Sequence, residues 1–244
     1  MTVNDVAEKI AHKYGFEDIY FIPSEMPGEA VAILVYPYAP FDDSEYIPAY
    51  YLASNASYHA LSDFTRELCA QGIHAENIFI HIKQAAEAAK LGIMGKNSLL
   101  HMRNHGSRVV LYSVAIQGAV AQEYDALPID ICANCDICIK SCPTGALTSE
   151  VFCRDKCLRQ YMDEPPYPDF VEENIKTYLG CEICMQVCPY NAHLQKGTVS
   201  DEIREAFLPE NVIANPNSVK QYVGRNIKSS RLKADAQALI KRRK

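Results

Sequence analysis

The chain has 244 residues, of which 48% are hydrophobic and 22% charged, and its formal net charge is −6. At about 150 residues per domain, this length predicts one large or two small domains with a substantial core. No apolar stretch approaches the roughly 18 residues that a membrane-spanning helix needs, which excludes a transmembrane protein. Residues 1–15 carry early acidic side chains and lack the apolar run of a secretory signal, so we expect a cytoplasmic protein with no membrane contact.

Four elements are predicted in the N-terminal part. Apolar residues at helical spacing predict a helix over residues 3–14, and a short strand is expected at residues 18–22. The near-continuous apolar run of residues 30–38 is typical of a strand covered on both faces. Residues 46–70 repeat apolar positions at helix-like intervals up to Gly72, which predicts one long helix or a helix pair.

In the middle of the chain, helix and strand patterns give way to a segment rich in cysteine and proline. Residues 83–92 are strong helix formers that end at a glycine, and residues 109–116 have a second buried-strand pattern, so an α/β domain is expected over residues 1–127. The chain then becomes rich in cysteine and proline with little periodicity, which indicates a second domain over residues 128–198. The remainder, residues 199–244, predicts short helices separated by prolines.

Basic side chains are concentrated at one end of the chain. Residues 220–244 contain nine Lys or Arg residues and a single acid, Asp235, so the preceding residues carry a formal net charge of −14. Such a block is typical of a tail that contacts a polyanion. A solvated surface helix explains the same composition, so both interpretations stay open at this point.

The ten cysteines carry the strongest signal, because a cytosolic cysteine pattern usually binds metal or serves catalysis. One motif has the spacing C-x2-C-x2-C-x3-C-P of bacterial ferredoxins, and a later one has the spacing C-x2-C-x3-C-P. Their cysteines are, in order, Cys132, Cys135, Cys138 and Cys142, then Cys181, Cys184 and Cys188. The two motifs predict a ferredoxin-like domain with two 4Fe–4S clusters.

Two such clusters need eight thiolates, and the cysteine before each proline crosses to the other cluster. The first cluster would then bind Cys132, Cys135, Cys138 and Cys188, and the second would bind Cys142, Cys181 and Cys184. The eighth ligand would be Cys157 or Cys153 from the connecting segment. Zinc bound by four thiolates is the alternative, although three cysteines within seven residues followed by Cys-Pro favour a cubane cluster. Cys69 is expected to be a small buried hydrophobic residue.

Several segments resemble the epoxyqueuosine reductase family, the cobalamin-dependent enzymes of queuosine biosynthesis in tRNA. The main one is the block KLGIMGKNSLLHMRNHGSRVVLYSVAI, Lys90 to Ile116, ahead of the di-cluster module. Further matches are PGEAVAILVYPY from Pro27, YYLASNASYHAL from Tyr50 and GCEICMQVCPYN from Gly180. The resemblance covers about residues 15–195.

The resemblance implies a nitroreductase-like α/β domain that binds cobalamin, and it favours Cys157 as the eighth cluster ligand. It also implies that electrons pass from a flavodoxin or ferredoxin through both clusters to cobalamin, and that an epoxide of a tRNA nucleoside becomes an alkene. The general acid of the family is an aspartate, and an ungapped count back from Gly92 places Glu76 at its position. Cofactor contacts are expected from Tyr58, His59, Gly95, Lys96, Asn97 and Ser98.

Three departures keep other functions open. Glu76 replaces the aspartate, no acid precedes Tyr58, and the helical-repeat region that helps longer family members hold tRNA is absent after the last cysteine. The basic end could compensate electrostatically, since phosphate contacts give affinity without sequence specificity. The chain could therefore be a short paralogue with another substrate, a di-cluster electron carrier without cobalamin, or a corrinoid reductase of a small molecule, akin to reductive dehalogenases.

Overall fold

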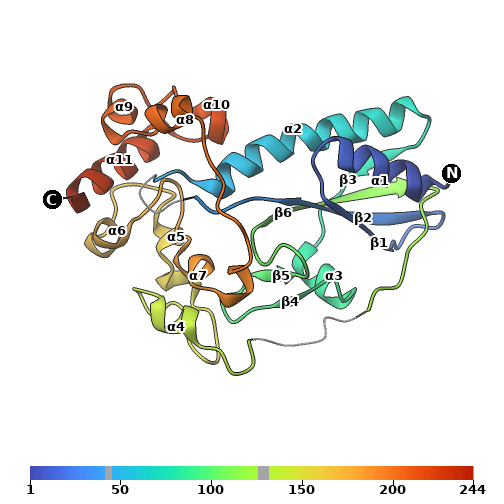
Figure 1. The fold of residues 1–244 in the computed structure, drawn as a ribbon, viewed down its shortest axis with the longest axis horizontal. Helices are drawn as coiled ribbons and strands as arrows, with labels where there is room; N and C mark the ends of the chain where they lie inside the picture. The colour runs from blue at the N-terminus through green and yellow to red at the C-terminus, as the bar shows by residue number, and fades with distance from the viewer. Residues whose placement is uncertain (42–45, 126–131, 244) are drawn as a thin grey trace. The chain divides into compact units, whose positions relative to one another are not determined.

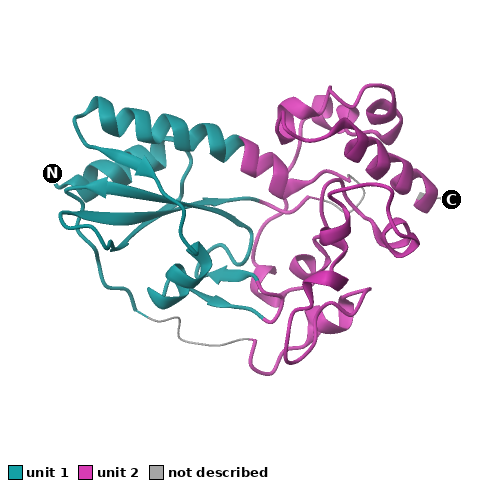
Figure 2. Ribbon diagram, turned by 180° about the vertical axis from the view of Figure 1, so that it is seen from behind, with its two compact units in different colours: residues 1–38, 56–95, 99–130 teal, residues 39–55, 96–98, 131–244 magenta. Residues whose placement is uncertain are grey.

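The structure is a computed structural model that describes residues 1–41, 46–125 and 132–243. The chain divides into two compact units (Figure 2). The first unit consists of Met1–Tyr38, Ala56–Gly95 and Leu99–Asp130, and the second of Ala39–Asn55, Lys96–Ser98 and Ile131–Lys244. The expected domain boundary at residues 127–128 lies outside the described residues. None of the helices in the described part is long and apolar enough to cross a bilayer.

The first unit is built on a four-stranded antiparallel sheet with the order β1-β2-β6-β3 (Figure 1). The strands are β1 (Asp18–Pro23), β2 (Glu29–Pro37), β6 (Val109–Gln117) and the short edge strand β3 (Ala75–Asn77). The two longest strands, β2 and β6, pair along their full length in the centre of the sheet.

Strand β2 is covered on both faces, as its apolar run predicts. Successive side chains of a strand point to opposite faces. Ala30, Ala32 and Leu34 belong to the core beneath helices α1 (Val3–Lys13) and α2 (Ala49–Ala70). Val31, Ile33 and Val35 belong to a second core, shared with α3 (Ile82–Ala88). The predicted α/β layer is thus confirmed, with helices on both sides of the sheet (Figure 1).

The helices begin and end where local chemistry dictates. A capping box forms at the start of α1, where the Thr2 hydroxyl accepts from the Asp5 backbone N–H and the Asp5 carboxylate accepts from the Thr2 N–H. Helix α2 is one helix rather than a pair, and Gly72 follows it at φ 79°, a left-handed conformation that favours glycine. Cys69, in the last turn of α2, is exposed, so the expectation of a buried residue was wrong.

Between α3 and β6 the chain forms a hairpin that the sequence patterns do not predict. Its strands are β4 (Gly92–Met94) and β5 (Leu100–Met102). A side chain at Gly92 would place its Cβ 2.8 Å from the carbonyl oxygen of His101 on the facing strand. Gly92 therefore permits close strand pairing, and it is Lys90, at φ 63°, that takes the left-handed conformation after α3.

The second unit is made of short helices that share one hydrophobic core. Its core unites residues from the cysteine-rich segment, such as Met162 and Tyr178, with Phe207 and Leu239 from the C-terminal helices. The helices are α4 (Ile137–Ser141), η2 (Arg154–Lys156), α5 (Leu158–Tyr161), α6 (Asp169–Asn174), α7 (Ile183–Gln186), η3 (Pro189–Asn191), α8 (Asp201–Ala206), α9 (Pro209–Ala214), α10 (Lys220–Val223) and α11 (Ser229–Arg243). The predicted helical C-terminus is confirmed, and it packs with the cysteine-rich segment as one body.

Candidate functional site

Each cysteine motif wraps around a helix of one turn. Cys138 lies in α4, and Cys142 ends that helix. In the second motif Cys184 lies in α7, and Cys188 precedes η3. Tight turns such as that from the Cys135 N–H to the Cys132 carbonyl oxygen (3.2 Å) hold the flanking cysteines close to these helices. Because α4 and α7 also contact each other, the fold brings the two motifs together.

One set of thiols gathers around Cys188. Burial raises the pKa of Cys188, and the nearby thiols of Cys132, Cys138 and Cys135 raise it further. Burial likewise raises the pKa of Cys138, with added contributions from Cys132 and Cys135. The cysteine from the end of the second motif is therefore in electrostatic contact with three from the first. Cys132, Cys135, Cys138 and Cys188 are referred to below as the first thiol group.

A second set gathers around Cys181 and Cys184. Burial raises the pKa of Cys181 to about 11, with further contributions from Cys157 and Cys142. Burial raises the pKa of Cys184 to about 12, and the neighbours that add to this effect include Cys181, Cys157, Cys138 and Cys142. Cys138 thus approaches both sets. Cys142, Cys157, Cys181 and Cys184 are referred to below as the second thiol group.

Two further cysteines are candidates for the eighth place. Cys157 stands between η2 and α5, and it is among the neighbours that raise the pKa values of Cys181 and Cys184. Cys153 precedes η2, where its backbone N–H donates to the Ala146 carbonyl oxygen at 2.7 Å. Cys157 is thus in electrostatic contact with Cys181 and Cys184, and it stays the expected eighth ligand.

Cys142 differs from the other thiols in its hydrogen bonding. Burial favours its neutral form, but the Thr144 hydroxyl, 3.6 Å from the sulfur, and backbone groups of Thr144, Ala146 and Leu147 outweigh that effect and lower the pKa of Cys142. These donors would stabilise a thiolate at this position. Within the described ranges, no group of three or more His, Cys, Asp or Glu side chains is arranged to hold a metal ion.

The turn from Gly95 to Ser98 lies at the tip of the β4–β5 hairpin. The Gly95 N–H donates to the Leu99 carbonyl oxygen at 2.8 Å, and Ser98 has a φ of 60°. Asn97 is buried. The Lys96 ammonium donates to the carbonyl oxygens of Ala133 and Cys135, at 3.1 and 2.9 Å. It therefore contacts the loop of the first cysteine motif, within the second unit.

The other expected residues of the site lie in the first unit. Tyr58 and His59 are exposed on α2, with ring centroids 5.6 Å apart in an edge-to-face arrangement. Glu76 is exposed on the edge strand β3, where it pairs with Ala115 of β6. Gly95 also belongs to this unit, whereas Lys96, Asn97 and Ser98 belong to the second.

Sequence reasoning missed a buried polar network in the second unit. Arg231 and Asp235, both from the basic C-terminal stretch, are 6% and 0% exposed. Asp235 is the single acid in that stretch, and a lone acid four residues after an arginine on a helix was the available signal. Part of the basic stretch is thus internal structure.

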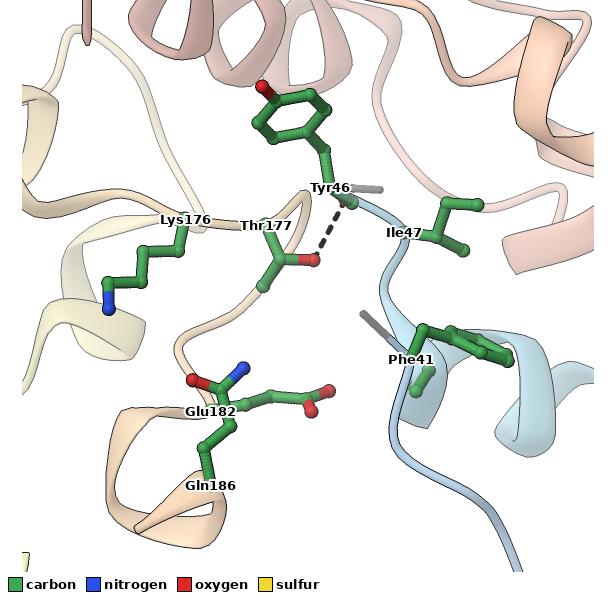
Figure 3. Close-up of a pocket in the computed structure, with 8 residues that line it drawn as sticks. Phe41, Tyr46, Ile47, Lys176, Thr177, Glu182 and Gln186 are labelled. Atoms are coloured by element: carbon green, nitrogen blue, oxygen red, sulfur yellow. Dashed lines mark hydrogen bonds between the residues drawn. The ribbon is translucent and has the colours of Figure 1, made fainter. Parts of the chain in front are cut away.

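The second unit also contains a solvent-open pocket beside the second cysteine motif (Figure 3). Its lining residues include Phe41, Lys176, Glu182 and Gln186. The Tyr46 carbonyl oxygen on its wall accepts from the Thr177 hydroxyl at 2.9 Å.

Comparison with known proteins agrees with these observations. Residues 131–191 match the model of the 4Fe–4S double cluster binding domain. Epoxyqueuosine reductase from Listeria monocytogenes is 36% identical over 111 residues, which is 43% of this chain and 28% of that protein. The same enzyme from Leadbetterella byssophila is 30% identical over 171 residues, or 64% of this chain and 56% of that protein. The chain therefore spans about a quarter to just over a half of these relatives.

Solved structures extend the likeness to the whole fold. Epoxyqueuosine reductase from Bacillus subtilis, in a form with its catalytic aspartate loop swung out of the active site, matches 99% of this chain and 82% of its own with a TM-score of 0.72 at 17% identity. An epoxyqueuosine reductase with an epoxyqueuosine-modified tRNA stem loop matches with the same TM-score and coverage at 16% identity. The expected resemblance to this family is thus confirmed, in sequence over part of the chain and in fold over nearly all of it.

Proposed function

We propose that this chain is an iron–sulfur, cobalamin-dependent reductase that acts as epoxyqueuosine reductases do, converting the epoxide of a tRNA nucleoside to an alkene. The observation that carries the proposal is the match of residues 131–191, which include all eight proposed thiol ligands, to the model of a double cluster binding domain. The fold shared with epoxyqueuosine reductases supports the choice of reaction.

We assign one 4Fe–4S cluster to each thiol group. The first cluster would be held by Cys132, Cys135, Cys138 and Cys188, and the second by Cys142, Cys157, Cys181 and Cys184. The chemistry of the donor set fits, because all eight ligands are thiols. The first group takes one member, and the second takes two, from outside its own C-x2-C run. The clusters would supply one-electron steps between a donor, such as a flavodoxin or a ferredoxin, and the reaction site.

The residues proposed to contact cobalamin are Tyr58, His59 and the turn from Gly95 to Ser98. Tyr58, which is 64% exposed, and the neighbouring His59 offer flat surfaces suited to an apolar macrocycle. The Lys96 ammonium is committed to two carbonyl oxygens, which leaves the Gly95–Ser98 turn to act mainly through its backbone. When bound, cobalamin would supply a strongly reducing cobalt centre.

The overall reaction consumes two electrons and two protons, breaks both C–O bonds of the epoxide and yields an alkene and water. Both protons end on the departing oxygen, and at least one must be delivered as the C–O bonds break. Glu76 is assigned to this step because its carboxyl is exposed on the edge strand and can meet a substrate from solvent. Glu76 is one methylene longer than the aspartate that the family resemblance implies, so its carboxyl reaches further from the strand.

The proposed macromolecular partner of the chain is tRNA. A relative has been solved with a tRNA stem loop, and this chain carries exposed cations at Arg225 and Lys233. Lys228 and Lys241, in contrast, form ion pairs with Glu164 and Glu172 at 3.0 and 2.6 Å. The surface available to phosphates is therefore smaller than the basic composition suggests.

The test is an anaerobic titration of the cluster-loaded protein with cob(II)alamin, read by electron paramagnetic resonance, followed by turnover of an epoxyqueuosine-containing stem loop. A protein-bound signal at one equivalent and formation of the alkene are expected. Cluster signals without bound cobalamin would replace the proposal with a di-cluster electron carrier. Bound cobalamin without turnover of the stem loop would point to a small-molecule substrate.

A further inference from the structure

Helix α11 directs two charged side chains into the core of the second unit. Arg231 and Asp235 are four residues apart and therefore lie on one face of the helix, one turn from each other. Both are buried, at 6% and 0% exposure. Burial of charged groups is costly unless each has specific partners, so the contacts of this pair indicate what it does.

Both side chains bind the same residue, Leu179. The Leu179 N–H donates to Oδ2 of Asp235 at 2.9 Å, and Nη2 of Arg231 donates to the Leu179 carbonyl oxygen at 2.6 Å. One helix face thus satisfies both backbone polar groups of a single residue in the core.

Leu179 needs such support because of its backbone. Its φ is 63°, in the left-handed region that disfavours a residue with a Cβ, and its side chain is completely buried. A conformation of this kind persists only where the surroundings over-determine it. The two hydrogen bonds with Arg231 and Asp235 provide that constraint, and the one donated by the Arg231 guanidinium is charge-assisted and therefore stronger than a neutral one.

The pair is itself held in place by further contacts. The Tyr167 hydroxyl donates to Oδ1 of Asp235 at 2.7 Å, so both carboxylate oxygens are engaged. Nη1 of Arg231 lies 2.8 Å from Oδ1 of Asp163, and its guanidinium lies 5.6 Å from the centre of the Tyr51 ring. These contacts hold both side chains in the positions from which they bind Leu179.

Leu179 stands two residues before Cys181 in the second thiol group. The intervening Gly180 pairs with Thr177 in an isolated antiparallel bridge, so the chain enters Cys181 from a turn in which Leu179 is held. We infer that Arg231 and Asp235 are positioning residues, which fix Leu179 and thereby the approach of the Cys181 thiolate to the second cluster. The inference rests on the proposed ligand set, which makes Cys181 a cluster ligand.

The test compares Arg231→Met with two other variants in the loaded protein. Arg231→Lys keeps a cationic donor, and Leu239→Ala removes a buried α11 side chain that belongs to the same core. The readouts are iron and acid-labile sulfide per chain, the electron paramagnetic resonance signal of each reduced cluster, and its midpoint potential. Asp235→Asn, which keeps the shape and one acceptor oxygen, is the milder variant if Arg231→Met fails to fold.

We expect Arg231→Met to displace the signal and potential of the second cluster, or to lower the iron content toward that of one cluster, while the first cluster keeps its properties. Asp235→Asn should give a smaller change in the same signal, and Arg231→Lys should restore part of the original signal. Leu239→Ala should lower the unfolding temperature without changing either cluster signal.

Two results would overturn the inference. The first is a second-cluster signal that Arg231→Met and Asp235→Asn leave identical to that of the unmodified protein. The second is an equal displacement by Leu239→Ala, which would reduce the pair to general support of the core. Failure of the proposed ligand set would look different from these two results, because the unmodified protein itself would then bind no second cluster. In that case the inference would be wrong as well.

Discussion

The Lys96 ammonium lies 2.9 Å from the carbonyl oxygen of Cys135, in the loop of the first cysteine motif. A cation at this point favours the more negative, reduced form of a cluster bound by that loop. Lys96→Met is therefore expected to lower the midpoint potential of the first cluster, by an amount on the order of 50 mV. Redox titration of the loaded protein measures the shift. Lys96→Arg should stay near the original potential, and an unchanged value in Lys96→Met would refute the electrostatic role.

Replacing Cys157 and replacing Cys153 should have different effects on the number of clusters that the protein binds. Cys157→Ser should lower the iron and sulfide content to that of one cluster, because Cys157 groups with Cys181 and Cys184. Cys153→Ser is the matched control and should keep both clusters. Chemical analysis of the two purified variants distinguishes the cases, and the reverse pattern would transfer the eighth ligand to Cys153.

Asp235 links stability to pH. Burial raises the pKa of Asp235 to about 7 from the ordinary value of 3.8, against the opposing effect of hydrogen bonds from Leu179 and Tyr167. Because the folded form then binds the proton more tightly than the unfolded form, stability decreases as the pH rises from about 4 to 7, by up to ~4 kcal/mol, and is level above that range.

Asp235→Asn removes this titration, so the variant should be less stable than the unmodified protein at acidic pH, and the difference should shrink as the pH rises from about 4 to about 7. Denaturant midpoints of both proteins across these pH values provide the measurement. A difference that is constant with pH would show that Asp235 is ionised throughout.

Glu76→Gln tests the proposed general acid. Removal of the carboxyl proton should slow turnover of the epoxyqueuosine stem loop by roughly 100-fold to 10,000-fold while iron content is unchanged, because Glu76 is exposed and lies in the first unit. Glu76→Asp should retain most activity. Single-turnover rates decide the matter, and full activity of Glu76→Gln would remove Glu76 from the mechanism.

The exposed cations predict how binding of tRNA responds to salt. Replacing Arg225 and Lys233 with Ala should reduce the slope of log affinity against log salt by about one for each phosphate that the variant no longer neutralises. Replacing Lys241, which is paired with Glu172, should have little effect. Binding isotherms at several salt concentrations provide the slopes, and equal slopes in all variants would place the tRNA elsewhere.

The predictable parts of this protein are those encoded over short stretches of sequence. The apolar run of β2 identifies a two-sided strand on its own. The local spacing of the cysteines likewise identifies the segment that resembles a double cluster binding domain. The sequence does not predict the β4–β5 hairpin, because strands of three residues are too short for an alternating apolar pattern to be recognised. Charge composition could not separate Arg231, which is buried, from Lys233, which is exposed two residues later on the same helix.

Contacts between distant segments account for the remaining differences. The target of Lys96 is a backbone carbonyl that lies 39 residues further along the chain, and no pattern in the sequence specifies such a partner. Similarly, residues 39–55 join the second unit although they precede most of the first unit's strands. Only tertiary packing decides these associations.

The contacts of α11 also bear on the order in which the protein matures. Helix α11 follows all ten cysteines in the chain, so a ribosome finishes every proposed cluster ligand before it makes the residues that hold Leu179. The first thiol group is complete once Cys188 has been synthesised, whereas the second waits for Arg231 and Asp235 before Cys181 is fixed.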